Sequence, residues 1–380
     1  MFVSFKRVPS TTPDLTLTRV RELLGDKADE LLSFDKPAIP KTKLMLPGTS
    51  FVDSVFAGIH GGSRVADSMR ALRDHGRLKG TGYYSFLPVD QGIEHDVFTF
   101  AKNLAYADPM NILELAEKGG CNAVATTYGA ARMFSEAAAR YRMPVIVKIN
   151  HNELLTHPLK YDQVMFATAK AAHDIGATAI GITIYFGSKE SNRQLQEVRD
   201  AFQAAHELGM ATVAWCYLRS SAFKVGDKDY AESADLTAQA NHLAASLGAD
   251  IVKQKAATCN GGVQAIRKRE SAPGKTDNIL NSKDSDIASA TGEHVIDWNR
   301  AQVIAGLAGR VGLINSGGAS GGKDDLAGAV RTAVINYRAG GTGLISGRKA
   351  FQKPMAEGIA LLHAIQDVYL LGALGEISIP

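Results

Sequence analysis

The strongest constraint on the fold is a regular alternation of short apolar runs and longer helical patterns, which begins at residue 83 and continues almost to the end. The apolar, β-rich runs cover residues 83–90, 122–128, 144–151, 178–186, 211–218, 249–256, 311–316 and 342–347. Helical patterns lie between and after them, at roughly 108–119, 130–141, 160–175, 190–208, 230–247, 297–308, 324–339 and 353–371. Strands that alternate with helices form βαβ units and pair in parallel. Eight such units predict an α/β fold, the (β/α)8 TIM barrel.

Glycines mark the ends of most of the expected helices. They stand just before the next apolar run, at Gly119, Gly120, Gly176, Gly209, Gly248, Gly309, Gly340 and Gly341. Glycine readily adopts the positive φ that ends a helix. A doubly wound sheet is the alternative fold, but no G-x-G-x-x-G motif follows the first run, as a dinucleotide-binding sheet would require.

The chain divides into an extension and a main domain. Residues 1–80 show helical spacing between Thr12 and Leu32 and again over 65–78, which predicts an N-terminal helical extension that packs on the main domain or on a neighbouring subunit. Residues 81–380 form the expected catalytic barrel. The polar stretch 260–293 interrupts the alternation after the sixth strand and predicts a long loop insertion, either a lid or a mobile surface segment.

Composition narrows the classes of function. With 42 basic and 39 acidic residues the net charge is +3, too balanced for a nucleic-acid or anionic-membrane protein. The N-terminus lacks an apolar signal region and no run approaches the ~18 apolar residues of a membrane span, so we expect a cytoplasmic protein. Cys121, Cys216 and Cys259 show neither disulfide nor metal spacing, which favours a reducing compartment and predicts no bound metal.

Two lysines lie within the sixth apolar run, Lys253 and Lys255. Side chains alternate along a strand, so both are expected on one face. Burial and a second ammonium group would lower the pKa of a lysine there, and the neutral amine could then form a Schiff base with a carbonyl substrate. The alternative is a lysine at a strand end that simply reaches solvent.

Other polar residues follow the remaining strands. Barrel enzymes carry their chemistry at the C-terminal strand ends, where this sequence places Asp90, His95, Lys148, His151, Tyr217 and Arg219. Each has a structural alternative: Asp90 as a turn cap, the histidines as loop residues, Tyr217 as core packing and Lys148 as a charge partner of Asp90. Together they provide the acids, bases and amines for imine chemistry.

The last two strand ends have the composition of a phosphate site. Ser316 opens a glycine-rich loop through Gly317 and Gly318, whose backbone N–H groups can turn inward without obstruction by a Cβ. Barrels commonly bind phosphate after the seventh and eighth strands, and Arg348 adds a bidentate donor there. The alternative is an ordinary glycine-rich turn.

Seven motifs in order resemble one known family. They are Leu87–His95, Val147–Asn150, Thr183–Ser188, Trp215–Arg219, Ala249–Lys255, Ile314–Gly318 and Gly347–Arg348. Over about residues 83–370 the chain is similar to the archaeal-type class I fructose-1,6-bisphosphate aldolases, the DhnA-like family, and part of its N-terminal extension resembles the bacterial branch.

The resemblance implies a role for each matched residue. Lys253 is the expected Schiff-base lysine, Lys255 tunes its pKa, and Tyr217 transfers protons with Trp215 beside it. Asp90 lies near the substrate hydroxyls and the amine. The remaining matches bind substrate: His95, Lys148 and Arg219 line the site or reach the second phosphate, and Ser316, Gly317, Gly318, Gly347 and Arg348 hold the first.

One motif departs from the family pattern. Archaeal members often have proline and lysine directly after the two glycines of the seventh strand, whereas this chain has Ala319 and Ser320. Lys323 is the nearest lysine that could replace the missing one. The preference among phosphorylated ketoses is therefore open.

The implied reaction is the reversible cleavage of fructose 1,6-bisphosphate to dihydroxyacetone phosphate and glyceraldehyde 3-phosphate, a step of glycolysis and gluconeogenesis. The resemblance implies no metal, no cofactor and a large homo-oligomer. Three alternatives stay open: another Schiff-base aldolase, thiolase or synthase of the same family acting on a different phosphorylated sugar, a metal-dependent aldolase, and a non-catalytic barrel.

Overall fold

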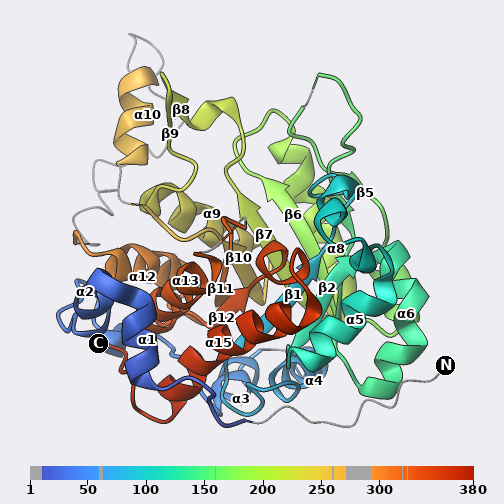
Figure 1. Ribbon diagram of the computed structural model, residues 1–380. Helices are drawn as coiled ribbons and strands as arrows, with labels where there is room; N and C mark the ends of the chain where they lie inside the picture. The colour runs from blue at the N-terminus through green and yellow to red at the C-terminus, as the bar shows by residue number, and fades with distance from the viewer. Residues whose placement is uncertain are drawn as a thin grey trace.

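The protein forms a closed barrel of parallel strands surrounded by helices (Figure 1). The computed structural model describes residues 11–59, 63–158, 160–258, 261–270, 292–318, 320–322 and 324–380. Around the barrel the strands follow the order β1-β12-β11-β10-β7-β6-β3-β2. Their bounds are β1 (Tyr84–Val89), β2 (Ala123–Thr127), β3 (Val145–Lys148), β6 (Ala179–Tyr185), β7 (Ala211–Tyr217), β10 (Ile251–Gln254), β11 (Gly312–Ser316) and β12 (Gly343–Ile345). The predicted TIM barrel is thus confirmed.

Helices cover the outside of the barrel. They are α5 (Pro109–Lys118), α6 (Tyr128–Tyr141), α7 (Ala169–Asp174), α8 (Ser191–Glu207), α9 (Ala234–Ser246), α12 (Val295–Ala305), α13 (Asp325–Ala339), α14 (Arg348–Phe351) and α15 (Met355–Ala373). Several begin at a side-chain cap: Thr127 Oγ1, for example, accepts the N–H of Ala130 and starts α6 directly after β2.

The connection after β3 differs from the expected single helix over 160–175. β4 (Asn150–His151) pairs antiparallel with β5 (Val164–Met165), and this small hairpin leaves only α7 in helical conformation. The pairing positions His151 at the base of the hairpin, where its side chain is fully buried.

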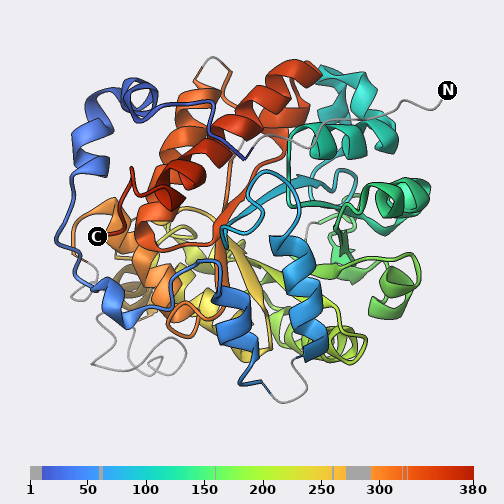
Figure 2. The ribbon, with the colours of Figure 1, turned by 90° about the horizontal axis from the view of Figure 1, so that it is seen from below.

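Two helices of the N-terminal segment close the lower end of the barrel. α3 (Phe51–Phe56) and α4 (Ser63–Arg73) lie on that side in Figure 2. Phe51, Phe56, Met69 and Leu72 are buried in one cluster with barrel-interior side chains such as Trp215. This apolar plug keeps water out of the lower barrel and leaves the upper end as the open one.

The first two helices pack on the outside of the barrel and are held there by buried arginines. Beside α1 (Leu17–Leu24) and α2 (Ala28–Leu32), Arg338 of α13 donates to the carbonyls of Leu31, Phe34 (2.7 Å) and Ser378 (2.9 Å). Arg300 of α12 donates to the carbonyls of Ile39 (2.9 Å) and Pro380 (3.1 Å). The segment 31–39 and the C-terminal residues 378–380 are thereby anchored to the same two helices, α12 and α13.

Smaller elements decorate the upper rim and the connections. They are the hairpin β8 (Lys224–Val225) with β9 (Lys228–Asp229), helix α10 (Gly262–Glu270), and the 3-10 turns Gly25–Lys27, Lys41–Lys43, Val97–Lys102, Leu104–Ala107 and Ser221–Phe223. Helix α10 occupies the start of the expected loop 260–293, and residues 271–291 lie outside the described residues, as do Cys259, Ala319 and Lys323. Across the described ranges, no helix is both long and apolar enough to cross a membrane.

Candidate active site

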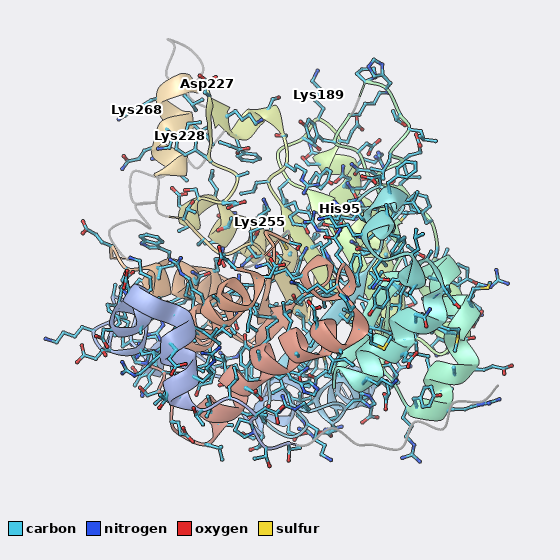
Figure 3. All side chains as sticks on the ribbon, in the orientation of Figure 1. His95, Lys189, Asp227, Lys228, Lys255 and Lys268 are labelled. Atoms are coloured by element: carbon cyan, nitrogen blue, oxygen red, sulfur yellow. The ribbon has the colours of Figure 1, made fainter. Side chains whose placement is uncertain are left out.

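A cavity of about 420 Å³ opens at the C-terminal ends of the strands. It is bordered by the ends of β1, β7, β10, β11 and β12, the region where the sequence predicted the chemistry. Figure 3 shows His95 and Lys255 on this upper side of the barrel. The polar residues that line it are Asp90, Gln91, Glu94, His95, Tyr217, Arg219, Glu232, Lys253, Lys255, Ser316, Thr332 and Arg348.

Lys253 lies near the end of β10 with its ammonium group buried in this cavity. The pKa of Lys253 is lowered to about 8, chiefly by burial; Lys148 and Arg219 contribute to this shift, and Glu94 and Asp90 oppose it. A lysine with this pKa is partly neutral near physiological pH, whereas an ordinary lysine is not. The geometry therefore supplies a nucleophilic amine.

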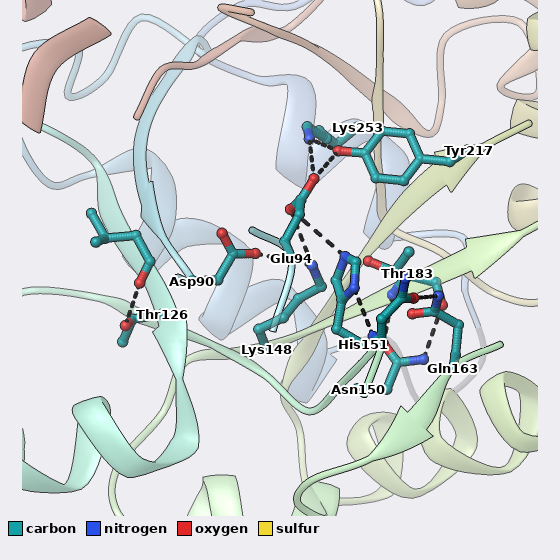
Figure 4. A network of polar contacts seen from close by, with 12 residues as sticks. Asp90, Glu94, Thr126, Lys148, Asn150, His151, Gln163, Thr183, Tyr217 and Lys253 are labelled. Carbon is teal, nitrogen blue, oxygen red and sulfur yellow. Dashed lines mark hydrogen bonds and ion pairs between the residues drawn. The ribbon is translucent and has the colours of Figure 1, made fainter. Parts of the chain in front are cut away.

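Tyr217, at the end of β7, contacts Lys253 directly. The Lys253 Nζ donates to the Tyr217 hydroxyl oxygen, and the Tyr217 hydroxyl donates to Glu94 Oε1 at 2.6 Å (Figure 4). Burial raises the pKa of Tyr217 well above its ordinary value, and the nearby Glu94 carboxylate raises it further. Tyr217 is thus a protonated phenol that can pass a proton to a neighbouring atom.

Glu94 connects most of the polar groups of the site. Its Oε1 lies 3.8 Å from Lys253 Nζ, and its Oε2 lies 3.7 Å from Lys148 Nζ and 3.9 Å from His151 Nε2. Burial alone would raise the pKa of Glu94, but the attraction of Lys253 and Lys148 outweighs it and holds the pKa well below the ordinary value. Glu94 is therefore a buried carboxylate.

Glu94 had no predicted role, although it stands in the matched motif Leu87–His95. The available signal was its position after β1: a turn in which Glu94 N–H reaches the Asp90 carbonyl (3.3 Å) brings both carboxylates inward. Gly92, with φ at 96°, permits this turn. A carboxylate four residues after another at a barrel strand end could have been proposed as a site residue on that ground.

Asp90 and Lys148 form a buried ion pair, with Lys148 Nζ 3.1 Å from Asp90 Oδ2. Burial, and next the repulsion of Glu94, raise the pKa of Asp90 to about 6 despite this pairing. Lys148 does not line the cavity: its Nζ lies beneath it, 4.2 Å from the centre of the Trp215 ring. This matches the alternative in which Lys148 is a charge partner of Asp90.

Trp215 also lies beneath the cavity and is fully buried. A Cβ at Gly181 on the adjacent β6 would come within 2.7 Å of the Trp215 ring. The absence of a side chain there makes room for the indole, on which Lys148 rests. Trp215 thus supports the floor of the site.

The two histidines after β1 and β3 differ in access. His95 lines the cavity, and burial lowers its pKa to about 4, so it is neutral at pH 7. His151 lies behind Glu94 and is fully buried, which lowers its pKa well below the ordinary value. Its Nδ1 accepts the N–H of Asn152 at 2.8 Å.

Lys255 lines the same cavity as Lys253, as strand alternation predicts, and has an acidic partner there. It follows the end of β10, and its Nζ lies 2.5 Å from Glu232 Oε1 on the cavity wall. The cations with the largest effect on the pKa of Lys253 are Lys148 and Arg219. The tuning role that the resemblance implies for Lys255 stays a prediction.

The glycine-rich end of the cavity is formed by Ser316, Gly317, Gly318, Gly347 and Arg348. A Cβ at Gly347 would lie 2.3 Å from the Pro88 carbonyl oxygen, and one at Gly317 would lie 2.7 Å from Ser346 Oγ, so both positions require glycine. Within the described residues the buried Ser346 Oγ has no hydrogen-bond partner. The loop is pinned from outside by Asp325, whose carboxylate accepts from Ser320 Oγ and Gly321 N–H, both at 2.7 Å.

In the part of the chain that the structure describes, no group of three or more His, Cys, Asp or Glu residues is arranged to hold a metal ion. Among the same residues, Cys121 and Cys216 are buried free thiols.

Comparison with known proteins identifies the family. The model of the DeoC/LacD family aldolases matches residues 84–353. The "probable fructose-bisphosphate aldolase class 1" of Chlamydia pneumoniae is 50% identical over 355 residues, 93% of this chain and 98% of the relative. The class 1 fructose-bisphosphate aldolase of Halobacterium salinarum is 28% identical over 287 residues, 75% of this chain and 90% of that protein.

A solved structure supports the fold independently. The fructose-bisphosphate aldolase from Slackia heliotrinireducens superposes with a TM-score of 0.62 at 22% identity and covers 89% of this chain and 96% of its own. The resemblance found in the sequence motifs is thereby confirmed. The chain belongs to the DeoC/LacD family of aldolases.

Proposed function

We propose that this protein is a class I fructose-1,6-bisphosphate aldolase that cleaves its substrate reversibly through a Schiff base on Lys253. The near full-length similarity to relatives named as class 1 fructose-bisphosphate aldolases supports the activity. The observation that carries the proposal is a buried lysine with a pKa of about 8, in hydrogen-bond contact with Tyr217 and in one cavity with a glycine-rich loop.

The first half of the reaction forms the imine. The lone pair of neutral Lys253 adds to C2 of the ketose, and the carbonyl electrons move to the oxygen. That oxygen takes up protons and leaves as water, while the nitrogen lone pair forms the C=N bond. The product is a protonated imine, which serves as the electron sink for the next step.

The second half breaks the carbon–carbon bond. A base removes the C4 hydroxyl proton, the C3–C4 bond breaks, and its electrons move through C3 and C2 to the iminium nitrogen, which gives an enamine and the aldehyde product. Asp90 and Tyr217 are the candidate bases, and Asp90 fits better because its pKa is about 6 whereas that of Tyr217 is raised well above the ordinary value. Tyr217 then protonates C3, and water releases the ketone.

The ends of the cavity suit the two phosphates. Ser316, Gly317, Gly318, Gly347 and Arg348 would bind the phosphate on C1 through backbone N–H groups and one guanidinium. His95, Arg219 and Lys255 line the same cavity and would meet the second phosphate. Lys148 and Trp215 would support the site from beneath.

We also infer where and in what form the enzyme acts. The scarcity of cysteines and their lack of disulfide spacing in the sequence favour the cytoplasm, and the family resemblance favours a homo-oligomer. Residues 81–380 would be the catalytic domain, with 1–80 as its helical extension and 260–293 as an insertion.

The decisive experiment is reductive trapping. The protein is treated with dihydroxyacetone phosphate and sodium borohydride, and the adduct is mapped by peptide mass spectrometry. One adduct on the peptide that contains Lys253 is expected, and Lys253→Ala should abolish both trapping and cleavage. An adduct on Lys255 or Lys148 would overturn the assignment, and trapping without cleavage of fructose 1,6-bisphosphate would favour another Schiff-base reaction on the same scaffold.

A further inference from the structure

We propose that Glu94 is a positioning residue that fixes the direction of the hydrogen bonds from Lys253 to Tyr217 to Glu94, and thereby leaves the lone pair of the Lys253 amine available to the substrate. This inference rests on the proposed Schiff-base function and assigns a role in it to a residue that the sequence motifs left without one.

The Tyr217 hydroxyl has a single proton to donate. Glu94 Oε1 lies 2.6 Å from the Tyr217 oxygen, and an ionised carboxylate can only accept a hydrogen bond. The phenol proton must therefore point to Glu94 (Figure 4). The Tyr217 oxygen is left as an acceptor toward Lys253, whose Nζ donates to it.

The neutral Lys253 amine must present its lone pair to the substrate. A neutral lysine nitrogen has two protons and one lone pair, and one of those protons is directed at Tyr217. The lone pair then faces away from Tyr217. If the phenol proton pointed to Lys253 instead, it would occupy the lone pair that must attack the carbonyl carbon. Orientation of the nucleophile by a partner that a third group orients is a common arrangement in covalent catalysis.

The surroundings of Glu94 favour a carboxylate over an amide. On the far side of Glu94, Oε2 lies 3.7 Å from Lys148 Nζ and 3.9 Å from His151 Nε2. His151 Nδ1 accepts the N–H of Asn152, so the proton of the neutral imidazole is on Nε2 and faces Glu94. Oε1 accepts the hydrogen bond from Tyr217, while Oε2 faces the Lys148 cation and the His151 N–H at distances longer than a hydrogen bond, so acceptor atoms suit both sides of the group. A glutamine would keep its oxygen toward the Lys148 cation and turn its NH₂ group to Tyr217, which reverses the chain.

The charged and titratable groups around Lys253 come from several strands. They are Asp90, Glu94 and His95 after β1, Lys148 at the end of β3 with His151 beyond it, and Tyr217 at the end of β7 with Arg219 beyond it. Among them Glu94 is the strongest influence that raises the pKa of Lys253, against burial, which lowers it. Loss of the Glu94 charge should therefore lower the pKa of Lys253.

The test is a double-mutant cycle with Glu94→Gln and Tyr217→Phe. In the wild-type background, Glu94→Gln should lower kcat by about 100-fold with a change in KM of less than about threefold. In the Tyr217→Phe background the same change should lower kcat by less than about threefold, because there is no phenol proton left to orient. In both backgrounds the acid limb of the kcat/KM profile should move to lower pH, since that effect acts through charge alone.

Two measurements keep the cycle interpretable. Asp367→Asn is the control, a buried carboxylate paired with Arg77 at 2.8 Å outside the cavity, and it should change the melting temperature without moving the pH profile. Wild-type trapping by borohydride must succeed first, because its failure would overturn the proposed function itself. If trapping succeeds and Glu94→Gln lowers kcat equally in both backgrounds, or leaves kcat unchanged in the wild type, the positioning role is wrong.

Discussion

Lys148 Nζ lies 3.1 Å from Asp90 Oδ2 and 4.2 Å from the centre of the Trp215 ring, directly under the cavity that holds Lys253. The pair joins the ends of β1 and β3 and places a fixed positive charge beneath the nucleophile. Lys148 has two effects. It lowers the pKa of Lys253, which favours the neutral amine, and it lowers the pKa of Asp90, which favours the carboxylate. One buried cation thus favours both the nucleophile and the base.

Lys148→Met should therefore shift the pH dependence of catalysis. Without the cation, the pKa of Lys253 rises, so the neutral amine is lost at pH 7 and recovered at higher pH. We expect kcat/KM to fall by about tenfold or more at pH 7 and much less at pH 9. The measurement is the pH profile of cleavage, after thermal unfolding has shown that the variant is folded.

Lys255→Met is the matched control for this shift. Lys255 pairs with Glu232, 2.5 Å away, whereas Lys148 is among the groups with the largest effect on the pKa of Lys253. Replacement of Lys255 should leave the acid limb of the kcat/KM profile unmoved, even where KM for a bisphosphate changes. A limb that moves in Lys255→Met and not in Lys148→Met would restore the tuning role to Lys255.

Arg348→Ala should weaken the binding of phosphorylated substrates selectively. Arg348 lines the glycine-rich end of the cavity, and loss of its charge-assisted hydrogen bonds should cost about 1.5–3 kcal/mol, seen as a raised KM. An unphosphorylated analogue should be affected far less. The exposed Arg310 provides a control substitution to alanine, and equal losses on both substrates would show that Arg348 is structural.

Activity should survive strong chelators. In the proposed mechanism the protonated imine on Lys253 accepts the electrons of the broken C3–C4 bond, a task that a metal ion performs in metal-dependent aldolases. Cleavage rates measured before and after prolonged EDTA treatment should agree. Loss of activity that zinc restores would contradict the imine mechanism.

The sequence predicted the barrel well because its signals are local. Most strands are apolar runs preceded by glycine, and most helices show their own period, so the order of elements follows without knowledge of any long-range contact. The same reasoning placed Lys253, Tyr217 and Asp90 at strand ends that the structure brings into one cavity.

The parts that escaped prediction depend on contacts between distant segments. Glu94 gains its role only through Tyr217, 123 positions away, and a single sequence does not show this proximity. Lys255 lines the same cavity as Lys253, as strand alternation predicts, but its ion pair with Glu232 joins segments that the sequence pattern does not connect. Val164–Met165 read as part of a helix because their antiparallel partners, Asn150–His151, lie in a different apolar run.

Arg338→Ala should loosen the N-terminal extension while leaving the chemistry intact. The buried guanidinium donates to the carbonyls of Leu31, Phe34 and Ser378, and its removal leaves those oxygens without their charged donor. We expect a loss of about 3 kcal/mol or more in the free energy of unfolding, measured by denaturant titration, with kcat changed less than about twofold. Arg331→Ala, an exposed position on the same helix α13, is the control and should change stability by no more than about 0.5 kcal/mol. A variant as stable as the control would show that the apolar contacts of α1 and α2 hold the extension without the arginine.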